Sequence, residues 1–197
     1  MVNVLKTLVA GAVAYGLGSI PFAVLVTWWK AGIDVRSVGS GHAGATNTMR
    51  VAGWGAGILV MVLDLAKGYF AVWLAQRLGG SELTPAVAAG LVVIGHCWPL
   101  YVGFRGGMGM ASGAGALLAI WPLGFVLAVG LAVVLQLVVR HSARANFFTG
   151  LLLVPLWAIF GVPCPLLMTT GVIGAIISYR ALSDWHRVYK ELWLDRE

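Results

Sequence analysis

The chain has 197 residues, of which 60% are hydrophobic and only 10% are charged. Soluble domains carry about 25% charged residues, so this composition excludes a soluble protein and indicates an integral membrane protein. The formal net charge of +6 lies mostly in short loops, as a bias of basic residues toward the inner membrane face produces. No basic run interleaved with aromatic residues suggests a nucleic-acid partner. We expect a single polytopic membrane domain over residues 1–197.

Apolar stretches of membrane length predict the helices, since about 20 apolar residues span a bilayer. The first covers roughly residues 4–29 and is interrupted at 18–21, where Pro21 removes a backbone donor. The next two cover roughly 54–78 and 85–102, with a short loop at 79–84 between them. Two longer apolar stretches follow, at 113–139 and 147–179, and both contain proline breaks, at 121–122 and 161–165.

The apolar stretches alone leave two topologies open. Counting each stretch once gives about five helices, while dividing the last two stretches at their prolines gives about seven, with the fourth short. Only the break at 121–122 brings Arg140 and Arg144 to the side of the other basic loops. The positive-inside rule therefore predicts an all-α integral membrane protein with about seven transmembrane helices, the N-terminus outside and the C-terminus in the cytosol.

The C-terminal segment, residues 180–197, has the pattern of an amphipathic helix. Leu182, Trp185, Tyr189 and Leu192 recur at spacings of three or four residues, and Trp193 is adjacent. Such a pattern predicts a cytosolic tail that lies on the inner membrane surface.

The most informative polar segment follows the first apolar stretch and reads Gly39-Ser-Gly-His-Ala-Gly-Ala-Thr-Asn-Thr-Met-Arg50. Its glycines let backbone N–H groups turn toward an anion, and Arg50 adds bidentate positive charge. A helix that begins near Thr46 would add a favourable dipole for phosphate. The alternative is a flexible polar connector. We favour a site for a phosphate-bearing substrate at the bilayer surface, with Ser40 and Arg50 as anion ligands.

A second glycine-rich segment, residues 104–112, has the glycines of a phosphate cradle but only Arg105 beside it as a cation. A tight turn between two helices is the alternative. The residues at 140–146, Ser142 among them, either complete a polar rim or form an ordinary positive-inside cluster.

Three ionisable residues lie within predicted helices. Asp64 and Lys67 are one turn apart, which favours an internal ion pair; the alternative places Lys67 beside a substrate phosphate. His96 is expected near the inner end of its helix, as a general base, as a donor to phosphate, or as a cap on a carbonyl. Cys97 and Cys164 have no metal-ligand spacing, so we expect no disulfide, metal or cofactor.

Taken in order, these segments resemble the bacterial acyl-phosphate:glycerol-3-phosphate acyltransferases of the PlsY type. The likeness covers roughly the first 115 residues and rests on five segments: Gly18-Ser-Ile-Pro-Phe22, Gly39–Arg50, Asp64-Leu-Ala-Lys-Gly68, Gly95-His-Cys-Trp-Pro99 and Gly106-Gly-Met-Gly109. The resemblance implies a small seven-helix fold in the bacterial inner membrane with its site facing the cytosol. It also implies acyl transfer from acyl phosphate to the 1-hydroxyl of glycerol 3-phosphate, giving lysophosphatidic acid.

The resemblance also assigns roles to residues. Ser40 and Arg50 would bind substrate phosphate, Asn47 would support their loop, His96 would line the site, and the backbone of residues 106–109 would hold the phosphoryl group. We therefore predict Ser40, Arg50 and His96 as catalytic residues. The predicted substrate-binding residues are Gly39, Gly41, His42, Thr46, Asn47, Lys67, Arg105, Gly106, Gly107, Gly109 and Ser142.

Departures from the family pattern keep a second function open. Met108 stands where the family has a lysine, and His42 stands where it has an asparagine. The family's serine-rich stretch is only loosely matched at residues 140–144, and its tail pattern is not matched around residues 179–190. We expect Arg105 to supply the missing charge. The alternative is a catalytically silent homologue that serves as a structural or lipid-binding subunit of a larger membrane complex. A small transporter or channel is a third class, suggested by the proline-broken helices.

Overall fold

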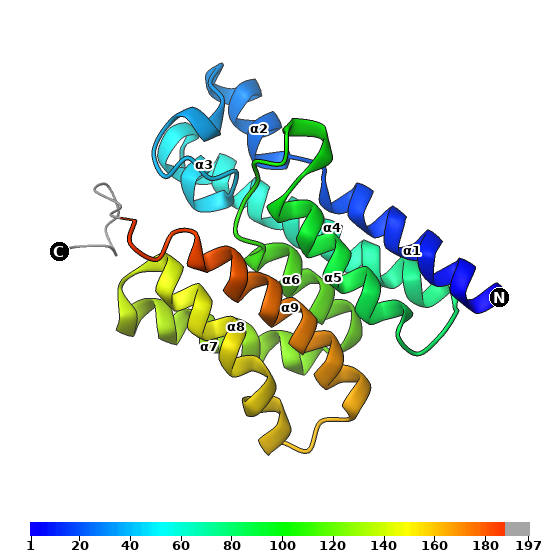
Figure 1. Ribbon diagram of the computed structural model, residues 1–197. Coiled ribbons are helices and arrows are strands. Elements are labelled where there is room, and N and C mark those ends of the chain that lie inside the picture. The colour runs from blue at the N-terminus through cyan, green and yellow to red at the C-terminus, as the bar shows by residue number, and fades with distance from the viewer. Residues whose placement is uncertain (188–197) are drawn as a thin grey trace.

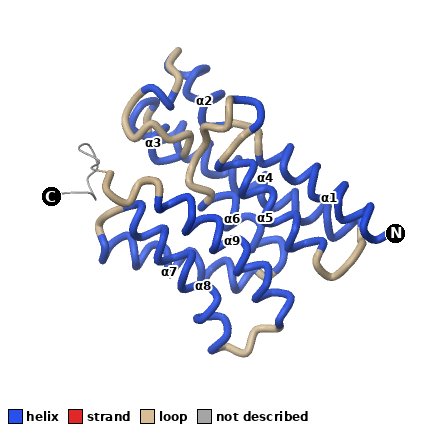
Figure 2. Tube along the Cα trace, in the orientation of Figure 1, coloured by secondary structure: helices blue, strands red, loops and turns tan. Residues whose placement is uncertain are grey.

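The computed structural model describes residues 1–187, and within that range every regular element is a helix (Figures 1 and 2). The elements in chain order are α1 (Val2–Gly18), α2 (Phe22–Ala31), the 3₁₀ turn η1 (Val35–Ser37), α3 (Ala45–Ala52), α4 (Trp54–Leu78), α5 (Thr84–Cys97), the 3₁₀ turn η2 (Leu100–Val102), α6 (Met110–Ile120), α7 (Pro122–Val139), α8 (Ser142–Ile159) and α9 (Cys164–Leu182).

Six helical stretches of the described residues are long and apolar enough to cross a membrane. The first of them, Val2–Ala31, combines α1 and α2, which are separated by the expected break before Phe22. Helix α6 has only 11 residues and corresponds to the short fourth span. The all-α membrane fold is confirmed, while the number of crossings and the sides of the two termini stay predictions.

The segment at 140–146 differs from the expected polar loop. Helix α8 already begins at Ser142, so that only a short turn separates it from α7. The Nδ1 atom of His141 accepts a hydrogen bond from the backbone N–H of Arg144 at 3.4 Å, which caps the first turn of α8. A polar first turn is therefore compatible with a helix here, because a side chain satisfies one of its free N–H groups.

The C-terminal segment also differs from a single long helix. Helix α9 ends at Leu182, and residues 183–187 form turns. The ring of Trp185 packs against Phe147 and Phe148 of α8, with ring centroids 5.2 and 6.2 Å apart. The other residues of the expected amphipathic pattern, Tyr189, Leu192 and Trp193, lie outside the described residues.

The connections between helices alternate between two ends of the bundle (Figure 1). At one end, the hydroxyls of Thr7 and Thr84 lie 2.7 Å apart, so the start of α1 meets the start of α5. At the opposite end lie α2, α3 and the end of α9. There the backbone N–H of Ala43 donates to the carbonyl of Gly106 at 3.4 Å. The fold therefore brings the two glycine-rich segments together.

Small residues allow the central helices to approach closely. The core that surrounds α5 is rich in alanine and valine, and Gly68 of α4 and Gly115 of α6 lie against the backbone of the opposite helix. This packing fixes α6 beside α4 and α5, and so fixes where the second glycine-rich segment ends.

Candidate functional site

The side chain of Asn47 organises the first glycine-rich loop. Its Oδ1 accepts from the backbone N–H of Ser40 at 3.1 Å, and its Nδ2 donates to the carbonyls of Val35, Val38 and His42 at 2.7 to 3.1 Å. Gly39 lies against it with φ +57°, and a Cβ at Gly39 would stand 2.2 Å from Oδ1. Asn47 thus supports the loop from inside, as the resemblance implied.

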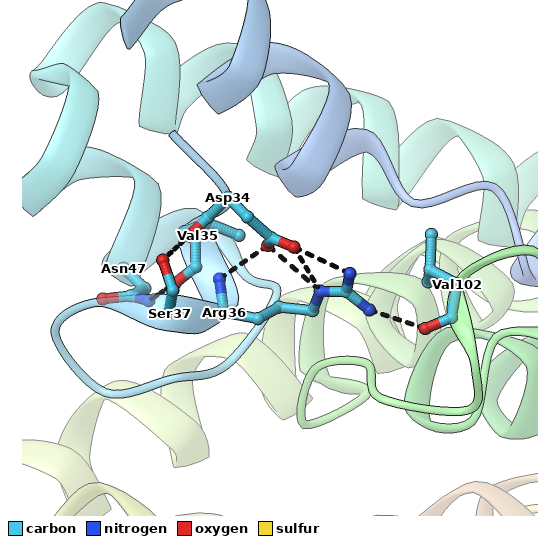
Figure 3. Close-up of polar contacts among 6 residues, drawn as sticks. All are labelled: Asp34, Val35, Arg36, Ser37, Asn47 and Val102. Carbon is cyan, nitrogen blue, oxygen red and sulfur yellow. Dashed lines mark hydrogen bonds and ion pairs between the residues drawn. The ribbon is translucent and has the colours of Figure 1, made fainter. Parts of the chain in front are cut away.

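Arg36 ties this loop to the turn after α5 (Figure 3). Its guanidinium pairs with Asp34 at 2.7 Å and donates to the carbonyl of Val102 at 2.6 Å. The side-chain hydrogen bond from Arg36 lowers the pKa of Asp34 below its ordinary value. Arg36 therefore holds the beginning of the loop, and Asn47 holds its centre.

The second glycine-rich segment closes the end of α5. The N–H of Gly106 donates to the carbonyl of Cys97, and the N–H of Gly107 donates to the carbonyl of His96, both at 3.1 Å. These two donors are therefore already used, which corrects the expectation that the whole backbone of residues 106–109 faces a phosphate. The free N–H groups at this point are those of the first turn of α6, which Gly109 caps with φ +83°.

Three charged or ionisable side chains are buried together below the two loops. Asp64, Lys67 and His96 are only 2%, 6% and 7% exposed. Asp64 Oδ1 lies 2.8 Å from Lys67 Nζ and 3.4 Å from His96 Nδ1. The carboxylate is therefore held electrostatically between the two side chains.

Lys67 forms the expected internal ion pair with Asp64, and its ammonium group also reaches the break between α1 and α2. Nζ donates to the carbonyl of Ile20 at 2.9 Å, in the break between α1 and α2, and lies 5.6 Å from the ring centroid of Phe22. The carbonyl of Ile20 also accepts from the backbone N–H of Phe22 at 3.1 Å, so the break between the helices presents one oxygen to two donors, and the buried ammonium group is one of them.

A small hollow opens where these segments meet. Its walls come from the α1–α2 break, from α4, from α5 and from both glycine-rich segments; the lining residues are Gly18, Ile20, Pro21, Phe22, Ala23, Ala43, Asp64, Lys67, His96, Pro99 and Gly106. Of the predicted site residues, only Lys67, His96 and Gly106 line it. Ser40 and Arg50 do not.

The ring of His42 is engaged by a residue that the sequence did not suggest. His42 Nε2 lies 2.6 Å from Asp184 Oδ2, just beyond the end of α9, and both residues are buried. Burial raises the pKa of Asp184. The hydrogen bond and charge of His42, together with the charges of Arg180 and Arg187, lower this pKa by more than burial raises it, so the net shift is downward. His42 therefore offers this nitrogen to a carboxylate rather than to a phosphate.

The remaining predicted residues do not line the hollow, and each lies in a different place. Thr46 and Arg105 are exposed, and Arg105 acts electrostatically on Asp34. Arg50 is in the last turn of α3. Gly41 approaches Arg187, whose Nη2 lies 3.2 Å from where a Cβ would stand.

The start of α8 is joined to the same end of the molecule through the segment after α9. Ser142 Oγ accepts from Gln136 at 3.0 Å. Arg144 donates to the carbonyl of Trp185 at 3.4 Å, next to Asp184.

Among residues 1–187, no group of His, Cys, Asp or Glu side chains could hold a metal ion. Of the residues that sequence reasoning missed, Ile20 had a usable signal, because a proline break inside a span exposes carbonyls. The pairing of Asp64 with His96 and of Asp184 with His42 had none, since each joins segments that are far apart in the chain.

Known proteins share this architecture. A family model described as "Glycerol-3-phosphate acyltransferase" matches residues 8–191. A glycerol-3-phosphate acyltransferase of Rubrobacter xylanophilus is 39% identical over 171 residues, which cover 84% of this chain and 83% of that protein.

Two crystal structures of PlsY (YgiH), an integral membrane glycerol 3-phosphate acyltransferase, superpose on the chain. The glycerol 3-phosphate form has a TM-score of 0.81 at 32% identity, and the lysophosphatidic acid form a TM-score of 0.80 at 31% identity. Each match covers 92% of this chain and 90% of the other. With a family match over nearly its whole length and the same membrane fold, the chain belongs to the glycerol-3-phosphate acyltransferase family.

Proposed function

We propose that this protein transfers an acyl group from acyl phosphate to the 1-hydroxyl of glycerol 3-phosphate. The hydroxyl oxygen forms a bond to the acyl carbonyl carbon, the bond from that carbon to the phosphate oxygen breaks, and the products are lysophosphatidic acid and inorganic phosphate. The observation that carries the proposal is the direct contact of the two glycine-rich segments above a hollow that holds a buried lysine.

The reaction requires two phosphate groups to be held near one another, so positive charge must be concentrated at the site. Arg50, in the last turn of the helix that follows the first loop, provides positive charge, the first turn of α6 provides backbone donors, and Lys67 provides a buried cation. An apolar acyl chain would lie against the exposed apolar side chains of the helices, where membrane lipid also gives the product an exit.

Asp64 has a supporting role in this scheme. It fixes Lys67 on one side and the Nδ1 atom of His96 on the other. The Nε2 atom of His96 then faces Gly107, since a Cβ there would stand 2.3 Å from it. His96 is thus positioned to bond a substrate oxygen. The hydroxyl proton passes to the departing phosphate, which is a better acceptor than any carboxylate at the rim.

We place the site on the cytosolic side of a bacterial inner membrane. Most basic residues of the loops lie at the end of the bundle that carries the site: Lys30, Arg36, Arg50, Arg105, Arg140, Arg144 and Arg180. The opposite end carries Arg77 and Glu82, whose charges cancel, and Lys6, which leaves that end with less positive charge. The positive-inside rule assigns the first end to the cytosol and the N-terminus to the outside.

Purified protein in detergent, given acyl phosphate and radiolabelled glycerol 3-phosphate, should form labelled lysophosphatidic acid. Arg50→Ala should lose most of this activity, and Arg77→Ala, at the other end of the bundle, should keep it.

A catalytically silent subunit would instead purify with a stoichiometric partner and show no turnover. Met108, an apolar side chain in the second glycine-rich segment, is the feature that favours this alternative. Activity in the purified single chain would exclude it.

A further inference from the structure

We propose that Arg180, at the end of α9, binds a phosphate oxygen of a substrate between the two glycine-rich segments. The ligand it would take is a phosphate monoester or acyl phosphate, and the assignment rests on the proposed acyl transfer. It adds α9 to the segments that form the site and supplies the cation that the second glycine-rich segment lacks.

The register of α9 places Arg180 between the two segments. Ile177, Arg180 and Asp184 follow one another at spacings of three and four residues and so share one side of the helix and its last turn. Ile177 Cγ1 lies 3.5 Å from where a Cβ of Gly109 would stand, in the second segment. Asp184 pairs with His42, in the first. Arg180 lies between these two contacts.

The charge of Arg180 reaches the residues of the site. Its guanidinium acts electrostatically on His96 and Cys97 at the end of α5, as well as on Asp184. By contrast, Arg105, the cation expected from the sequence, is exposed and acts on Asp34 at the outer edge of the first loop. Arg180 is therefore the better placed of the two.

The guanidinium of Arg180 also has an unused donor. Nη1 donates to Ser183 Oγ, but Nε is buried and has no hydrogen-bond partner among residues 1–187. A buried N–H without a partner is costly, particularly on a charged group, and native proteins rarely leave one unexplained. A phosphate oxygen would satisfy it with a charge-assisted hydrogen bond.

The contact between His42 and Asp184 holds this arrangement in place. It joins the turn after α9 to the first loop at 2.6 Å, and Arg187 Nη1 adds a second contact to Asp184 at 3.2 Å. These contacts fix the turn that follows Arg180 against the first loop, and they keep the end of α9 beside that loop. His42 and Asp184 are thus positioning residues for Arg180.

Direct binding separates this assignment from the proposed reaction. Titration calorimetry of the purified full chain with glycerol 3-phosphate, and with inorganic phosphate, measures affinity without turnover. Arg180→Gln should weaken binding about 10- to 100-fold, because it removes a charge-assisted hydrogen bond. Arg180→Lys should weaken it about 5-fold, since an ammonium does not reproduce the guanidinium fork. Arg77→Gln is the matched control and should bind as the parent does.

Unchanged affinity of Arg180→Gln would overturn the assignment, as would an equal or larger loss in Arg105→Gln. Should Arg180→Gln fail to fold, Arg180→Lys decides, and parental affinity in that variant refutes the assignment. A parent protein that binds phosphate through Arg180 yet forms no lysophosphatidic acid would support the assignment and refute acyl transfer. A parent that binds neither probe would refute the assignment.

Discussion

Replacing Gly107 by alanine tests whether the two glycine-rich segments must touch. The added Cβ would stand 2.3 Å from His96 Nε2 and 2.6 Å from the carbonyl oxygen of Ala43. The backbone of Gly107 is not left-handed, so the methyl acts through contact alone. To restore ordinary contact distances, the first loop or His96 must move by about 1 Å.

A displacement of about 1 Å at a reacting centre costs about 100-fold in rate, or about 2.7 kcal/mol of transition-state stabilisation. The overpacking itself should destabilise the fold by about 1 to 3 kcal/mol. Gly107→Ala should therefore remain folded in detergent but lose about 100-fold in kcat/KM for formation of lysophosphatidic acid.

The assay compares this variant with Gly130→Ala. Gly130 lies in α7 with nothing within 4 Å of its Cβ position, so that variant should keep parental activity. Both proteins are checked by thermal unfolding in the same detergent. Parental kcat/KM in folded Gly107→Ala would refute the reasoning, because the site would then not depend on contact between the two segments.

Three further predictions concern the supports of the site. Lys67→Met leaves the buried carboxylate of Asp64 without its ammonium partner, so thermal unfolding should show a loss of about 3 to 5 kcal/mol, and adding Asp64→Asn should recover part of it; parental stability in the single variant would contradict this. Asn47→Ala leaves the carbonyls of the first loop without their donor and should cost about 2 kcal/mol together with most activity; unchanged kcat/KM would show that the loop holds itself. The lowered pKa of Asp184 means that its carboxylate stabilises the fold above the ordinary value of 3.8 and loses this effect as pH falls through the lower folded value. The Tm difference between the parent and Asp184→Asn should therefore be full at neutral pH and vanish in acid, and a difference that persists there would implicate something other than the contact with His42.

The apolar pattern predicted the helices well because bilayer thickness fixes their length. Helix α4 has the expected bounds, Trp54–Leu78, and the breaks before Phe22 and at Pro122 follow from the missing proline donors. The predicted start of α8, near residue 147, was wrong. The helix begins at Ser142, because the side chain of His141 caps its polar first turn.

Within the site, local features were predictable and tertiary pairs were not. The ion pair of Asp64 with Lys67 follows from spacing on one helix. No local pattern shows that His42 contacts Asp184, or that the backbone N–H groups of Gly106 and Gly107 donate to carbonyls at the end of α5. These contacts depend on how α5 and α9 pack, which a single sequence does not reveal.

The central claim is that both glycine-rich segments hold the phosphate of one substrate. A crystal structure of the protein soaked with glycerol 3-phosphate tests it most directly. The account predicts a phosphate in hydrogen-bond contact with the first loop and with the first turn of α6. A phosphate bound by only one of these segments, or at the opposite end beside residues 79–84, would contradict it.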